Sequence, residues 1–163
     1  MATATGVLFT AAMLLSPRHG VLARLGRRLM LINRILCEDV LAVLYRAEEK
    51  VRTAGYTSGE LANVCHASSI NTRLAVFRLT RTGRLSRDEG LLKLTERGRQ
   101  SGQRLVRSHR LWESYLQSNT NLPADHVHAT AERLEHLTDD DLRAQLAKEA
   151  PGTDPHGKPI PNE

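Results

Sequence analysis

Residues 57–94, TSGELANVCHASSINTRLAVFRLTRTGRLSRDEGLLKL, decide the fold of this 163-residue chain. Two helices are predicted within them, each preceded by hydroxyl side chains that can act as N-caps: Thr57 or Ser58 for residues 59–64, and Ser68 or Ser69 for the helix that ends near Arg81. Two short runs, 84–87 and 91–94, flank a turn and predict a small hairpin. Helix, turn, helix and hairpin in this order are typical of a winged helix.

The predicted winged helix carries side chains suited to DNA. Small polar groups near the start of its second helix can contact base edges, and arginines along the helix and the hairpin can contact phosphates. The predicted DNA-binding residues are Ser69, Asn71, Thr72, Arg73, Arg78, Arg81 and Arg87. The alternative is a winged helix that binds proteins and has a solvated basic face.

The charges are distributed unevenly along the chain. Residues 1–111 hold 19 Lys and Arg against 8 Asp and Glu, a net charge of +11, whereas residues 112–163 hold 4 against 10, a net charge of −6. A basic front half indicates a module that binds polyanions. The two cysteines, Cys37 and Cys65, make no disulfide framework and indicate a reducing compartment.

The segments that flank the winged helix are mostly helical in pattern. Residues 35–52 predict a helix with one apolar stripe, and three further helices are predicted over residues 95–116, 124–137 and 139–148. Residues 150–163 are rich in proline and glycine and predict an extended arm. The sequence therefore predicts a mostly α protein.

The N-terminus begins with an apolar run, GVLFTAAMLL at residues 6–15, followed by arginines. The run is short of the roughly 20 residues that a membrane-spanning helix needs. We expect a helical extension that packs on the body of the protein or on a partner. The alternative is a membrane-associated segment, because cations beside an apolar run favour anionic lipid.

Histidines and glutamates recur at helical spacing in the acidic half. The set consists of His109, Glu113, His128, Glu132, Glu135 and His136. Residues four apart share a helix face, so two such helices packed antiparallel would bring imidazoles and carboxylates together. Such a group suits a divalent first-row metal ion. The alternative is a solvated polar face.

Three segments carry a family resemblance: HRLWESYL (109–116), HVHATAERLEH (126–136) and DPHGKPIP (154–161). With the His-x3-Glu and Glu-x2-Glu-His spacings, they resemble the diphtheria-toxin-repressor and manganese-transport-regulator family of metal-dependent transcription repressors. The resemblance extends over about residues 37–161. It implies a winged helix-turn-helix DNA-binding domain at 35–107, a helical metal-binding dimerisation domain at 108–149, and a C-terminal tail at 150–163.

The resemblance also assigns ligands to two metal sites. The regulatory site would consist of Asp39, Glu132, Glu135 and His136. The neighbouring ancillary site would consist of His109, Glu113 and His128. Ala42 stands where the manganese branch of the family has a further carboxylate, which is a departure from a complete two-metal site.

Carboxylates and imidazoles without a thiolate or thioether favour Mn(II), with Fe(II) next, and Zn(II) would bind such a set at least as tightly in vitro. The family resemblance further implies a cytoplasmic homodimer that represses metal-uptake genes. Metal would bridge the first helix of the winged helix to the second domain and so orient two winged helices on a double-stranded DNA operator. No enzyme is expected, because no separate nucleophile or phosphate-binding glycine loop accompanies the His/Glu set.

The front end resembles a different protein. VLFTAAMLLSPRHGVLARL, residues 7–25, resembles the last transmembrane segment and exit of a metal-type ABC transporter permease. Residues 1–34 are accordingly expected to form a separate extension, a permease-like remnant through which the chain contacts a membrane or a transporter. The alternative function is a cytoplasmic metal-sensing domain associated with a metal ABC transporter.

Overall fold

The computed structural model describes residues 16, 20–50, 55–120, 124–150 and 152–162, and the chain divides into two units, residues 1–35 and 36–163. The apolar run predicted at residues 6–15 lies outside the described residues. Within the described ranges, no helix is both long enough and apolar enough to cross a membrane.

Helix α2 (Val21–Glu49) begins well before the start predicted at residue 35. Residues 21–34 are mainly Leu, Arg and Met, which favour helix, and the single glycine among them, Gly26, does not end it. From Leu36 onward the predicted apolar stripe is buried. Its buried members are Leu36, Val40, Leu41, Leu44 and Ala47.

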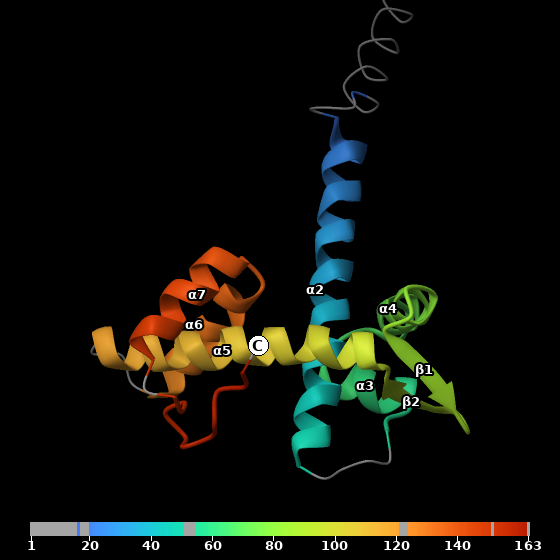
Figure 1. The fold of residues 1–163 in the computed structure, drawn as a ribbon. Coiled ribbons are helices and arrows are strands. Elements are labelled where there is room, and N and C mark those ends of the chain that lie inside the picture. The colour runs from blue at the N-terminus through green and yellow to red at the C-terminus, as the bar shows by residue number, and fades with distance from the viewer. Residues whose placement is uncertain (1–15, 17–19, 51–54, 121–123, 151, 163) are drawn as a thin grey trace, which may run out of the picture. The chain divides into compact units, whose positions relative to one another are not determined.

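The predicted winged helix is present (Figure 1). It consists of helices α3 (Ser58–Val64) and α4 (Ser69–Arg81) and strands β1 (Leu85–Asp88) and β2 (Leu91–Leu94). Thr57 caps α3: its Oγ1 accepts a hydrogen bond from the Glu60 backbone N at 3.2 Å, and the Glu60 carboxylate accepts one from the Thr57 backbone N at 2.8 Å. This reciprocal capping box fixes where α3 begins.

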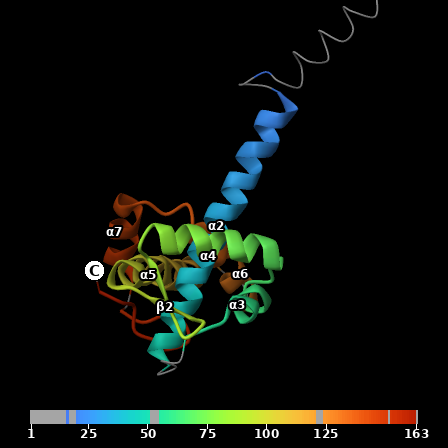
Figure 2. The same cartoon turned by 90° about the vertical axis from the view of Figure 1, so that its right-hand side faces the viewer.

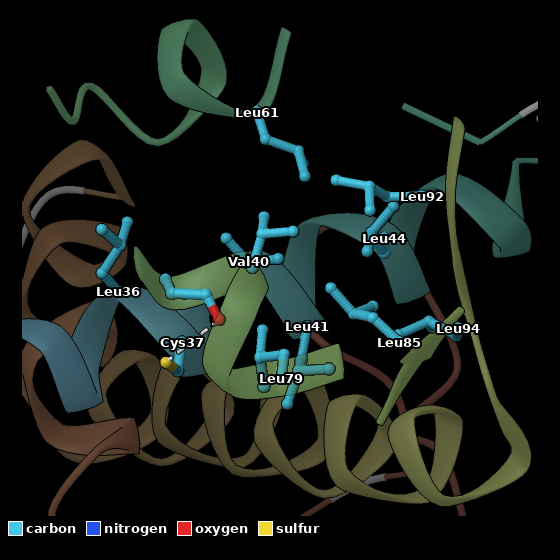
Figure 3. Close-up of a cluster of buried hydrophobic side chains, with 12 residues drawn as sticks. Leu36, Cys37, Val40, Leu41, Leu44, Leu61, Leu79, Leu85, Leu92 and Leu94 are labelled. Carbon is cyan, nitrogen blue, oxygen red and sulfur yellow. Dashed lines mark hydrogen bonds between the residues drawn. The ribbon is translucent and has the colours of Figure 1, made fainter. Parts of the chain in front are cut away.

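The α2 stripe packs on the winged helix to form its core (Figure 3). Val40, Leu61 and Leu92, from α2, α3 and β2, have no exposed surface. Leu85 pairs with Leu94 in the antiparallel hairpin, so leucines from both strands reach this cluster. The C-terminal part of α2 is therefore held rigidly against the helix-turn-helix.

Three helices form the second half: α5 (Glu96–Asn119), α6 (Ala124–Glu135) and α7 (Asp140–Glu149). Figure 1 shows α6 and α7 together at the C-terminal end of α5, and both pack against it. The predicted domain boundary at residues 107 and 108 falls inside α5, which continues from one half to the other. Because α6 ends at Glu135, His136 lies in the turn that follows and not on the helix predicted to residue 137.

The C-terminal tail is folded, whereas its prolines and glycines predict an extended arm. Asp154 is buried, and its Oδ1 accepts hydrogen bonds from the backbone N of His156 and of Lys158 at 2.9 and 2.8 Å. A bridge joins Thr153 to Pro159. Arg110 of α5 donates a hydrogen bond to the Pro159 carbonyl at 2.8 Å, so the tail is tied to the helix by contacts between residues distant in sequence.

Gly102 allows α5 to approach α2 closely. A Cβ atom at this position would lie 2.7 Å from the Leu41 carbonyl oxygen and 2.9 Å from Cβ of Tyr45. We expect Gly102→Ala to lower the free energy of unfolding by about 1–3 kcal/mol, because overpacking outweighs the better helix propensity of alanine. Urea unfolding would measure this, with Gln100→Ala on the exposed side of α5 as the control. An increase in stability would contradict the close approach.

Candidate metal centre

Side chains of the types that bind metal ions converge from α2, α5, α6 and the turn after α6. Two groups of three place one ligand atom of each residue within 4.8 Å of the others. The first group is His109, Glu113 and His128; the second is Asp39, Glu135 and His136. Six of the seven predicted ligands therefore lie in these two groups.

The first group joins α5 to α6. His109 and Glu113, four residues apart on α5, are both buried, and His109 Nε2 lies 3.2 Å from Glu113 Oε1. His128 Nδ1 of α6 lies 2.7 Å from the same oxygen and 3.1 Å from His109 Nε2. The His128 side chain is 56% exposed, so the group opens to solvent, and a cavity of about 650 Å³ lies beside it.

Histidine neighbours keep Glu113 ionised. Burial alone would raise the pKa of Glu113, but hydrogen bonds with His109 and His128 outweigh it and lower this pKa to about 2. Burial would likewise lower the pKa of His109, and hydrogen bonds with Glu113 and Glu135 raise it instead. Protons on imidazoles thus occupy the positions where a cation would neutralise the carboxylates.

The second group joins α2 to the end of α6. His136 Nε2 lies 3.3 Å from Asp39 Oδ1 and 3.8 Å from Glu135 Oε1, while His136 Nδ1 lies 2.8 Å from Glu38 Oε2. Burial would lower the pKa of His136, but hydrogen bonds with Asp39 and Glu38, together with the charge of Glu135, raise it to about 10. The imidazolium of His136 therefore joins two carboxylates of α2 to the end of α6.

Glu38 was missed by the sequence prediction, although it contacts His136 at 2.8 Å. Its only signal in the sequence is its place beside Asp39. Neighbouring positions on a helix point about 100° apart, so helix geometry does not pair Glu38 with Asp39. Glu38 reaches the site because His136 lies in a turn between the two carboxylates.

Glu135, a member of the second group, also contacts the first group. One of its carboxylate oxygens lies 2.6 Å from His109 Nδ1 of the first group, and the other lies 3.8 Å from His136 of the second. Arg46 of α2 approaches the first of these oxygens to 3.9 Å. Glu135 is also only 4% exposed, so its charge is balanced by these neighbours and not by solvent.

Glu132 lies outside both groups. The buried face of α6 consists of Val127, Ala131 and Glu135, each four residues after the last, and Glu132 falls one position past that face. Its side chain is exposed, and its assignment as a ligand stays a prediction. Ala42, where the resemblance notes a missing carboxylate, is buried at 2% exposure.

The two thiols, Cys37 and Cys65, are outside both groups as well. Burial raises the pKa of Cys37, and it raises the pKa of Cys65 to about 11. Thiols with raised pKa values stay protonated at neutral pH and are poor ligands and nucleophiles.

The outer face of α4 carries most of the predicted DNA contacts, and Figure 2 looks onto this helix. Ser69, Asn71, Arg73, Arg78 and Arg81 are exposed on it, and Arg87 is exposed on β1. Thr72 does not lie where the sequence predicted a DNA contact. It is completely buried, and its Oγ1 donates a hydrogen bond to the Ser68 carbonyl at 3.1 Å. It therefore packs in the core and does not face a ligand.

The same face of α4 has an apolar stripe that the sequence analysis missed. Ile70, Leu74 and Phe77 are 78%, 54% and 61% exposed. They recur at the four- and three-residue spacing of one helix face. The signal was present in the sequence, but such spacing predicts a buried face more often than an exposed one.

Comparisons with known proteins found relatives of this chain. Residues 95–162 match the family model "Iron dependent repressor, metal binding and dimerisation domain". The iron-dependent repressor IdeR of Mycobacterium tuberculosis is 35% identical over 128 residues, which cover 76% of this chain and 54% of IdeR. A probable metal transport system membrane protein of Chlamydia trachomatis is 30% identical over 162 residues, which cover 96% of this chain and 36% of that protein.

A solved structure of a manganese-dependent transcriptional repressor in complex with manganese superimposes with a TM-score of 0.68 at 32% identity. The match covers 77% of this chain and 58% of that repressor. The chain spans about half, or less, of the length of the curated relatives described above.

Proposed function

We propose that the protein is a metal-dependent transcriptional repressor, because it belongs to the diphtheria-toxin-repressor and manganese-transport-regulator family. Its residues 95–162 match the metal binding and dimerisation domain of the iron-dependent repressors. It would bind its operator as a homodimer in the cytoplasm and repress metal-uptake genes. Metal binding would favour the arrangement of the two winged helices that fits DNA.

The observation that carries this proposal is the contact between Asp39 and His136. Asp39 lies on α2, which is packed rigidly on the helix-turn-helix, and His136 follows α6 of the second half. A ligand that binds both residues therefore couples the DNA-binding module to the proposed dimerisation module. A metal that prefers the DNA-competent arrangement shifts the population toward it, typically with 1–3 kcal/mol of coupling.

The donor set supports Mn(II) first and Fe(II) next. Both groups offer carboxylate oxygens and imidazole nitrogens and no sulfur, and such mixed oxygen and nitrogen ligands suit these ions. Zn(II) would bind the same donors in vitro. Asp39, Glu135 and His136 would hold the regulatory ion, and His109, Glu113 and His128 would hold the ancillary one. Bound there, an ion supplies the positive charge that histidine protons supply in its absence.

On the DNA side, the flanks and the centre of the α4 face have different roles. Arg73 and Arg78 lie on opposite flanks of this face, at positions from which they would contact phosphates on either side of a major groove. The central stripe of Ile70, Leu74 and Phe77 would contact thymine methyl groups, because apolar side chains read that group in the major groove.

Fluorescence anisotropy tests the function directly. Labelled DNA from upstream of the gene itself and of the nearest metal-transporter genes would be titrated at fixed salt, with and without Mn(II), beside a scrambled duplex. Binding that depends on both metal and sequence is expected. Binding indifferent to both would reduce the protein to a basic surface that attracts polyanions and would refute the proposal.

Arg73→Ala should weaken binding to the operator and to the scrambled duplex alike. Each phosphate contact contributes about one unit to the slope of log K against log salt, so the slope should fall by about 1. Arg133→Ala, which removes an exposed arginine from α6, is the control and should leave the slope unchanged. An unchanged slope for Arg73→Ala would show that Arg73 does not contact a phosphate.

A second candidate is favoured by the alignment with the chlamydial metal transport protein, which covers nearly the whole chain. In this version the same ligands sense metal for a metal ABC transporter, and residues 1–34 contact the transporter or the membrane. Cell fractionation separates the two functions. The transporter-associated protein should co-purify with transporter subunits, whereas the repressor should be recovered on its operator DNA.

A further inference from the structure

We propose that the N-terminal part of α2, residues 21–35, binds the surface of an anionic lipid bilayer. This segment belongs to the first unit of the chain and carries none of the predicted metal ligands or DNA contacts. Lipid binding by this segment is therefore independent of DNA binding, and anionic lipid would be the chemical partner in the membrane contact expected of residues 1–34.

Large apolar side chains of this segment are exposed. They are between 43% and 72% exposed, a degree unusual for so many apolar residues in succession. The exposed residues are Val21, Leu22, Leu25, Leu29, Met30, Leu31 and Ile32. At about 100° per residue, Val21, Leu25, Leu29 and Ile32 share one face of the helix.

The cations of the segment gather on a different face. Arg24, Arg27, Arg28 and Arg34 fall within about 120° of arc, next to the apolar face, and this arc also holds Leu31 and Ile35. A helix with arginines on one face and leucines on the other lies in the interface of a bilayer, its apolar face among the acyl chains and its cations at the headgroups. Four arginines in 15 residues exclude a membrane-spanning role for this segment.

The charge pattern favours lipid over a second copy of the chain. Residues 1–37 contain five arginines and no acidic residue, since the first acid of the chain is Glu38. Pairing two copies of this helix would bring arginines together without carboxylates to balance them. Anionic headgroups supply that missing charge, and clustered basic residues are attracted to them.

Sedimentation with lipid vesicles tests the proposal on the full chain. The wild-type protein should bind vesicles of phosphatidylcholine mixed with phosphatidylglycerol and should bind pure phosphatidylcholine much more weakly. The double variant Leu25→Gln, Leu29→Gln should lose at least about tenfold in vesicle affinity, because it removes apolar burial without changing charge. Arg24→Gln with Arg28→Gln should lose the preference for phosphatidylglycerol.

The matched control is Val64→Gln with Leu137→Gln, which makes the same change at two exposed apolar positions outside this segment and outside α4. It should bind vesicles like the wild type, and circular dichroism should show that all variants fold. Unchanged vesicle binding by the Leu25, Leu29 variant would overturn the proposal. A second outcome would also overturn it: the wild type does not bind vesicles but forms dimers, and the Leu25, Leu29 variant is monomeric. A second copy of the chain would then cover the apolar face. DNA anisotropy on the same samples reports the proposed repressor function separately.

Discussion

Glu135→Ala is expected to abolish metal-stimulated binding to the operator while leaving salt-dependent, nonspecific DNA binding intact. The Glu135 carboxylate contacts His109 of the first group at 2.6 Å and His136 of the second at 3.8 Å. Its removal therefore deletes a predicted ligand of the second group and also the contact that joins the two groups. The loss should equal the whole coupling between metal and DNA, about 5- to 150-fold in affinity. Anisotropy with and without Mn(II) measures it.

The control variants separate loss of metal binding from loss of fold. Glu135→Gln retains size and hydrogen-bonding capacity but removes the charge, and it should also lose the metal response. Asp141→Ala, which removes an exposed carboxylate on α7, should retain it. Operator-specific binding that survives Glu135→Ala at low free metal would refute the linkage mechanism, provided that circular dichroism shows a folded variant.

Local signals allowed the winged helix to be predicted. The caps Thr57 and Ser68 and the turn before β2 act over a few residues, so the sequence pattern places α3, α4 and the hairpin close to where they lie. The start of α2 was predicted too late, because the expectation followed the buried stripe that begins at Leu36. Helix propensity continues through the exposed residues before it, and burial does not decide where such a helix begins.

The site could be predicted in part for the same reason. His109 and Glu113 share a helix face by spacing alone, and the structure brings them to 3.2 Å. The link to Asp39 came from the family resemblance, since no spacing rule connects α2 to α6. Glu38 escaped prediction because the end of α6 at Glu135 determines its contact with His136.

The fold of the C-terminal tail and the burial of Thr72 could not be predicted from amino-acid composition. Proline and glycine predict irregular chain, but they do not say whether a buried carboxylate such as Asp154 will organise it. Thr72 resembles its polar neighbours on α4 in size and chemistry, and only the packing of that helix on α2 decides that it points inward. Both depend on tertiary contacts that a single sequence does not contain.

Metal binding should release a proton, because His136 is protonated in the metal-free protein over a wide pH range. Its pKa of about 10, against 6.5 for an ordinary histidine, means that a metal ion must displace that proton between these two values. A histidine binds metal as the neutral imidazole. The metal affinity should therefore rise about tenfold per pH unit in this window for each proton released. Calorimetry in buffers of different ionisation enthalpy counts the protons.

The same pKa fixes the sign of the pH dependence of metal-free stability. Because folding raises the pKa of His136, its contribution is fully present below pH 6.5 and is lost as the pH rises through about 10. Glu113 has the opposite sign: with its pKa lowered from 4.5 to about 2, its contribution is present above pH 4.5 and is lost toward pH 2.

Metal should therefore stabilise the protein most at alkaline pH, where no proton holds the carboxylates of α2 and α6 together. His136→Gln cannot be protonated, so it should release fewer protons on metal binding than the wild type and should lose the alkaline decline in urea stability. If both properties are unchanged, a group other than His136 carries the proton in question.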